Sequence, residues 1–131
     1  MAVETPGMTL SFEAGADLSA KQYHFVKLNG ANGRSVVACS GVTDRPVGVL
    51  QNDPTSGQMA TVMVTGITQL VADADLAAGD TIGTSADGQA AVYAAGTDTT
   101  KYIVGWVRDP NTAAGGIITA VINCFIPGRA A

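Results

Sequence analysis

The side chains that could do acid–base chemistry in this chain are few. His24 is the only histidine among the 131 residues, and it lies in the apolar and aromatic segment 22–26. A catalytic histidine needs a nucleophile or an acid beside it, and the sequence contains none of the local motifs of serine, cysteine or zinc hydrolases. We therefore interpret His24 as a histidine on the surface of a strand.

Three carboxylates lie close together in the sequence, at Asp73, Asp75 and Asp80. Carboxylate oxygens suit a calcium ion, but the glycine and the terminal glutamate of an EF-hand loop are not in place. A carboxylate pair for glycoside hydrolysis at Asp73 and Asp75 would need a cleft with sugar-stacking aromatic side chains, which this chain lacks. We expect these aspartates to cap turns.

Glycine and cysteine patterns also give no catalytic site. Segments 30–33 and 83–88 contain several glycines, but no helical pattern follows to present an N-terminus to phosphate. Cys39 and Cys124 are the only cysteines and have no metal-binding spacing, and the sequence leaves open whether they pair. We expect no catalytic residue, no metal, no cofactor and no enzyme activity.

Composition excludes several kinds of partner. The net charge is −4, with seven basic residues that form no run, so phosphate binding is not expected and nucleic acid is excluded as a partner. No apolar run approaches the roughly 18 residues of a membrane span, and the N-terminus lacks the pattern of a secretion signal. We expect synthesis and folding in the cytoplasm and no membrane partner.

The elements that carry these residues are predicted to be strands. The chain is 47% hydrophobic and 14% charged and contains 16 glycines, a composition typical of short strands joined by tight turns. A flexible arm is expected over residues 1–8, because Thr5, Pro6 and Gly7 suit neither a helix nor a central strand. Residues 9–131 are then predicted to form a single β domain.

Two halves of the sequence resemble each other. Segments 14–20 and 72–78 are identical at five of seven positions. The pairs Asp53-Pro54 and Asp109-Pro110 are the only Asp-Pro steps, and each follows a Val-Gly strand. These matches predict pseudo-repeats over about 14–66 and 72–123.

Two such units, each with an apolar face, predict an all-β fold, a small closed or nearly closed antiparallel barrel or sandwich. A turn or short helical turn is expected at the Asp-Leu step of each half. The predicted core residues are Leu18, Phe25, Val49, Leu76 and Trp106.

Several of these segments resemble a known family. The similarity is carried by segment 14–28, by segment 46–54 with Gly57 and Ala60, and then by Gly66, segment 77–80 and Val104-Gly105. Over about residues 10–125 the chain resembles the small capsid decoration, or cement, proteins of tailed bacteriophages.

The resemblance implies a compact β protein on the outer surface of a virion. Such a protein binds the expanded head and braces neighbouring subunits of the major capsid protein, commonly as a homotrimer and in some cases as a dimer. The family has no catalytic residues to transfer.

The expected capsid contact is the N-terminal arm, through the residues Ala2, Val3, Glu4, Thr5, Pro6 and Met8. An extended arm can add a strand to the edge of a sheet in the shell protein, because that mode needs main-chain hydrogen bonds more than particular side chains. The alternative reading is a virion adhesin or head-fibre module that binds a ligand on the host surface.

Overall fold

The computed structural model describes residues 7–30, 32–110, 113–125 and 128–130, and these contain strands and turns but no helix. The strands are β1 (Gly7–Ala14), β2 (Phe25–Asn29), β3 (Asn32–Ala38), β4 (Gly48–Leu50), β5 (Met59–Val71), β6 (Thr81–Thr84), β7 (Ala90–Val92), β8 (Tyr102–Ile103), β9 (Gly105–Asp109), β10 (Ile117–Asn123) and β11 (Gly128–Arg129). The prediction of an all-β fold is confirmed.

The first half of the chain closes into a five-stranded barrel. Its strands pair in the order β1-β3-β2-β4-β5, and β5 returns to pair with β1 along residues 7–13. The barrel differs from the predicted antiparallel one in a single pairing, because β1 and β3 run parallel at Glu13↔Ser35 and Ala14↔Val36.

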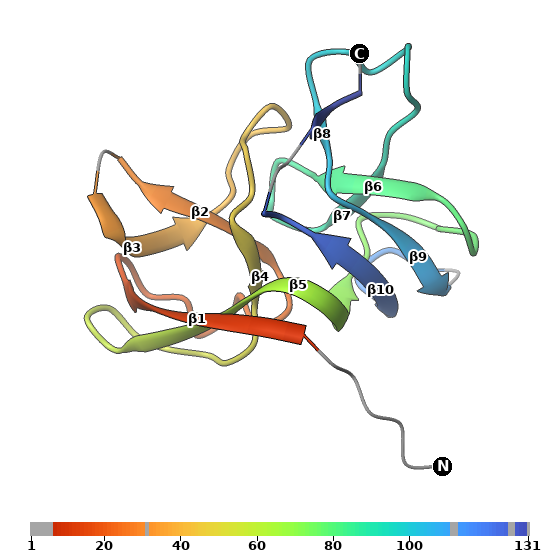
Figure 1. The fold of residues 1–131 in the computed structure, drawn as a ribbon. Helices are drawn as coiled ribbons and strands as arrows, with labels where there is room; N and C mark the ends of the chain where they lie inside the picture. The colour runs from red at the N-terminus through yellow and green to blue at the C-terminus, as the bar shows by residue number, and fades with distance from the viewer. Residues whose placement is uncertain (1–6, 31, 111–112, 126–127, 131) are drawn as a thin grey trace.

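The remaining strands build a second lobe on the same long strand. β5 curves from the barrel into this lobe (Figure 1). Gly66 of β5 pairs with both Gly7 of β1 and Ile122 of β10, and its φ of 132° is a conformation that side chains rarely adopt. Beyond the bend β5 pairs with β10, and the order continues β10-β9-β6-β7. A parallel bridge between Ala72 and Ala90 brings β7 back to the end of β5. β8 and β11 form a separate pair.

Strand pairing in the second lobe has the same order and register as in the barrel. Val49 of β4 pairs with Met63, and Trp106 of β9 pairs with Val121. The next strand follows the same rule, since Phe25 pairs with Val49 and Thr81 pairs with Trp106. By these pairings Phe25, Val49 and Met63 of the barrel wall correspond to Thr81, Trp106 and Val121 of the second lobe.

Turns rather than helices lie at the two Asp-Leu steps, so the expected short helical turns are not confirmed. The N–H of Lys21 donates to the carbonyl of Leu18, and the N–H of Asp80 donates to that of Ala77, as single turns. Leu18 packs in the barrel core and Leu76 in the core of the second lobe, each with 2% of its surface exposed.

The two lobes share one of the two apolar clusters. Alternate residues of the barrel strands, such as Val26, Leu50 and Val62, point into the barrel core. The residues between them, Phe25, Val49 and Met63, point outward and are buried with the interior of the second lobe. The side wall of the barrel is thus a part of the second lobe's core.

Trp106 is exposed, which corrects its assignment to the core. Its side chain is 45% exposed, whereas its neighbour Val107 is fully buried. Alternation along β9 directs Val107 inward and Trp106 outward. Val49, at the corresponding position, also points outward, but the second lobe covers it.

The N-terminal boundary also differs from the prediction. β1 begins at Gly7, and Gly7 and Met8 pair with Gly66 and Thr65 of β5, so these two residues belong to the barrel and not to an arm. The predicted contacts Ala2, Val3, Glu4, Thr5 and Pro6 lie outside the described residues.

Candidate interaction surfaces

His24 is a buried residue just before β2, which corrects its placement on a strand surface. Its Nδ1 lies 3.1 Å from the carbonyl oxygen of Gln22. Burial lowers the pKa of His24 below its usual range, with the hydrogen bond to Gln22 acting in the opposite direction. A neutral imidazole fixed by its own turn is a structural group.

The three aspartates do not converge on an ion site. Asp80 Oδ2 accepts a 2.9 Å hydrogen bond from the N–H of Ala77, while Asp73 and Asp75 are exposed. Within the described ranges no group of three or more His, Cys, Asp or Glu side chains could hold a metal. Asp80 therefore has the capping role that the sequence predicts.

Cys39 and Cys124 lie in the same apolar cluster and are unpaired. Burial raises the pKa of each thiol to about 12. At neutral pH neither thiol has the thiolate character that nucleophilic or redox chemistry needs.

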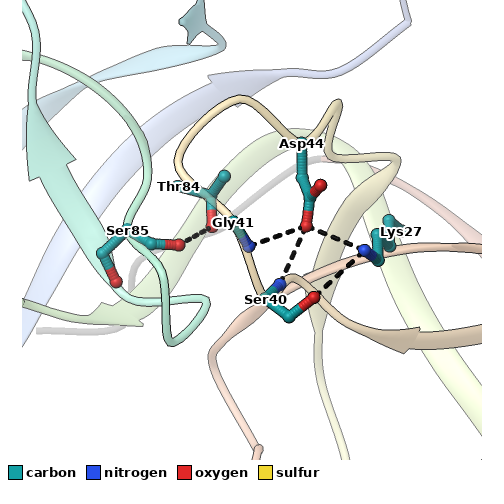
Figure 2. Close-up of polar contacts among 6 residues, drawn as sticks. All are labelled: Lys27, Ser40, Gly41, Asp44, Thr84 and Ser85. Atoms are coloured by element: carbon teal, nitrogen blue, oxygen red, sulfur yellow. Dashed lines mark hydrogen bonds and ion pairs between the residues drawn. The ribbon is translucent and has the colours of Figure 1, made fainter.

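A polar cluster that the sequence analysis missed lies where the two lobes meet. Asp44 Oδ2 accepts hydrogen bonds from Lys27 Nζ at 2.9 Å and from the N–H groups of Ser40 and Gly41 (Figure 2). Burial opposes the charge on Asp44, but these three donors together hold its pKa below the usual range. The cluster fixes loop 40–44, and its only sequence signal is an aspartate three residues after a Ser-Gly step.

Several large apolar side chains are exposed on the surface, among them Trp106, Leu10 and Leu28. A hollow of about 330 Å³ on the second lobe is lined by Thr81, Ile103, Trp106 and Val121, with other residues of β9 and β10. We call this surface the Trp106 face. It lies on strands β6, β9 and β10, on the outer side of the second lobe.

A second apolar surface lies at the end of the barrel near the β2–β3 turn. Leu10 of β1 and Leu28 of β2 lie on the inward side of their strands, yet they are 44% and 38% exposed. We call this surface the leucine end.

The β1 strand also has an open edge. On one side it pairs with β5 from Gly7 to Glu13, but on the other side its pairing with β3 is limited to Glu13 and Ala14. The edge of residues 7–12 therefore presents main-chain groups that can take up another strand. Met8, the one predicted contact that the structure describes, lies on this segment and is exposed.

No helix in the described residues is long and apolar enough to cross a membrane. Comparison with known proteins gives no match to a family model and no match among curated proteins. Among solved structures the chain is similar to the N base of the head fibre protein gp8.5 in bacteriophage phi29. The two are 18% identical, the match covers 89% of this chain and 94% of the other, and the TM-score is 0.67. The chain therefore shares its fold with the base of a phage head fibre.

Proposed function

We propose that this chain is a capsid decoration, or cement, protein that binds the outer surface of an expanded phage head and stabilises it by bridging subunits of the major capsid protein. The observation that carries the proposal is the shared fold with a head-fibre base over nearly the whole of both chains. The resemblance of segments 14–28 and 46–54 to decoration proteins supports the same conclusion from the sequence.

The exposed chemistry of the described residues suits adhesion better than catalysis. Its exposed groups include apolar side chains on strands and an open strand edge. His24 is buried with its Nδ1 against the carbonyl of Gln22, and both cysteines are buried as thiols, the form that is not nucleophilic. We propose that the protein is not an enzyme and binds neither nucleic acid nor membrane.

We also propose that the two lobes are copies of one β unit, joined through β5. The matching registers support this, and so do matching hydrogen bonds: Tyr23 N to Leu50 O and Gly79 N to Val107 O occupy corresponding positions. A duplicated unit with a shared core is rigid, which is what a brace between capsid subunits needs.

Capsid docking is proposed to use the N-terminal residues 2–6 together with the open edge of β1. A segment that continues β1 can pair with an edge in the shell protein, extending a strand that is already held by β5. Many copies on a closed shell then act together, so each contact can be weak.

The test is co-sedimentation of the purified protein with expanded, DNA-free heads and with unexpanded heads of a phage whose genome encodes this chain. We expect saturable binding to expanded heads and little to unexpanded ones. Deletion of residues 2–6, which leaves β1 intact, is expected to abolish binding, and Val92→Glu on β7 is the matched control. Full binding by the folded deletion variant would contradict the docking mode.

The second candidate is a head-fibre or adhesin module that binds a host-surface ligand, and the specific observation in its favour is the head-fibre base to which the chain is similar. Such a module would bind host cell envelopes in the same sedimentation assay. Binding to envelopes without binding to heads would favour this candidate. We propose synthesis in the host cytoplasm and, on the virion, an oligomer that is most simply a homotrimer.

A further inference from the structure

At the interface between the two lobes, the side wall of the barrel covers one end of the second lobe. The outward residues of the barrel wall, Phe25, Val49 and Met63, close one end of the second lobe, so they are buried in that lobe's core. The end that they close contains the β6–β7 turn and Thr84, which is 1% exposed. The side wall of the barrel therefore covers the end of the second lobe at the β6–β7 turn.

Close backbone contacts show how tightly the turn is seated. The N–H of Phe25 donates a 2.7 Å hydrogen bond to the carbonyl of Gly88. A Cβ atom at Gly88 would lie 2.9 Å from the carbonyl oxygen of Phe25 and 3.5 Å from that of Cys39. The β6–β7 turn thus packs directly on the barrel wall.

In the described part of the chain, the corresponding wall on the second lobe is partly exposed, with Trp106 45% exposed. By register, Phe25, Val49 and Met63 correspond to Thr81, Trp106 and Val121. These are the residues that line the Trp106 face, and Trp106 is the only tryptophan of the chain. A large aromatic side chain on a strand wall, over a hollow, has the form of a binding anchor.

The corresponding end of the barrel is open as well. Leu28 pairs with Val36 as Thr84 pairs with Ala90, so the leucine end corresponds to the end that the barrel wall closes. A Cβ atom at Gly30 in the β2–β3 turn, or at Gly33 at the start of β3, would meet nothing within 4 Å, in contrast to Gly88. Inside the chain, the barrel wall covers the β6–β7 end of the second lobe. The two corresponding surfaces, the Trp106 face and the leucine end, are exposed.

We propose that these two unused halves meet between copies: the Trp106 face of one chain closes the leucine end of the next. The occupant of the Trp106 face is a second copy of this chain, because the interface inside the chain already joins surfaces at the corresponding positions. Such a contact is heterologous, so it closes into a ring if the rotation between neighbours closes, and extends into a filament if it does not. The inference does not depend on capsid binding.

The apolar side chains on both surfaces support the contact. Leu10 and Leu28 replace the buried Thr68 and Thr84 at the corresponding positions of the second lobe. Between separate chains no covalent connection assists docking, so more apolar area is required than inside one chain. Leucine in place of threonine at these two positions supplies that apolar area.

Complementation between two variants tests the proposal. Trp106→Glu and Leu28→Glu each remove one half of the contact, and both side chains are partly exposed, so the fold should persist, as circular dichroism can verify. By light scattering over a range of concentrations, we expect the wild type to associate and each variant alone to be a single chain, with a dissociation constant raised by about 30-fold or more. An equimolar mixture should form a dimer, because the intact leucine end of the first variant meets the intact Trp106 face of the second.

The control is Val92→Glu, whose side chain is 50% exposed and lines a different hollow with Val42 and Asp73. It should associate as the wild type does. Trp106 also reports the contact directly, since its emission should shift to the blue on association in the wild type but not in Leu28→Glu. A wild type that stays a single chain, or a mixture that stays at the mass of single chains, would overturn the proposal. Association that survives both substitutions would overturn it as well.

Discussion

At the scale of single residues, the two buried thiols give a clear dependence of stability on alkaline pH. Their pKa is about 12 in the folded chain against 9.0 in an unfolded one, because burial disfavours the thiolate. As the pH rises from 9 to 12 the unfolded chain loses thiol protons that the folded chain keeps. The free energy of unfolding should therefore fall, by up to about 1.4 kcal/mol per pH unit for each thiol.

Urea unfolding at successive pH values measures this fall. In a Cys39→Ala, Cys124→Ala variant the free energy of unfolding should fall less steeply with pH. Some fall should remain, because burial also raises the pKa of Tyr93. Equal slopes for the variant and the wild type would refute the role assigned to the thiols.

Asp44 acts at the same scale but on the acid side. The hydrogen bonds that its carboxylate accepts outweigh burial and lower the pKa of Asp44. The carboxylate therefore stabilises the fold fully above the unfolded pKa of 3.8, and this stabilisation is lost as the pH falls through the folded pKa. Asp44→Asn should lower the free energy of unfolding at pH 7 by about 1–3 kcal/mol and remove this part of the acid dependence. Asp109→Asn, an exposed aspartate whose ion pair with Arg108 spans 4.0 Å, should change little.

At the scale of strands, the two Val-Gly steps have one physical cause. A Cβ atom at Gly48 would collide with the carbonyl oxygen of Met63 on β5, and one at Gly105 with that of Val121 on β10. Gly48→Ala and Gly105→Ala should each destabilise the fold by about 1–3 kcal/mol or more in thermal unfolding. Gly33→Ala on β3, where a Cβ atom meets nothing within 4 Å, is the control and should fold with nearly native stability.

Strands were also the level at which the sequence was most informative. The composition predicted short strands joined by tight turns, and the structure has them, because the preferences of β-branched residues and glycine are local. Alternation also separates Trp106 from Val107, but it does not say which side of a strand another lobe will cover. The sequence alone therefore could not distinguish covered Val49 from exposed Trp106, nor find the contacts of Asp44 across loop 40–44.

At the scale of the whole molecule, the shared cluster should make the two lobes unfold together. Phe25 belongs to a barrel strand but is fully buried in the core of the second lobe. Phe25→Ala should cost about 3–5 kcal/mol and shift a single transition, with Trp106 fluorescence and far-ultraviolet circular dichroism changing at the same denaturant concentration. Two separated transitions in the wild type would show that the lobes fold independently.

The central claim is that the protein braces a phage head, and the thermal stability of heads tests it most directly. Differential scanning calorimetry of expanded heads, with and without saturating protein, gives the temperature at which the shell comes apart. The account predicts a higher temperature with the protein, and no rise with the variant that lacks residues 2–6. Heads that bind the protein but come apart at an unchanged temperature would contradict the bracing role.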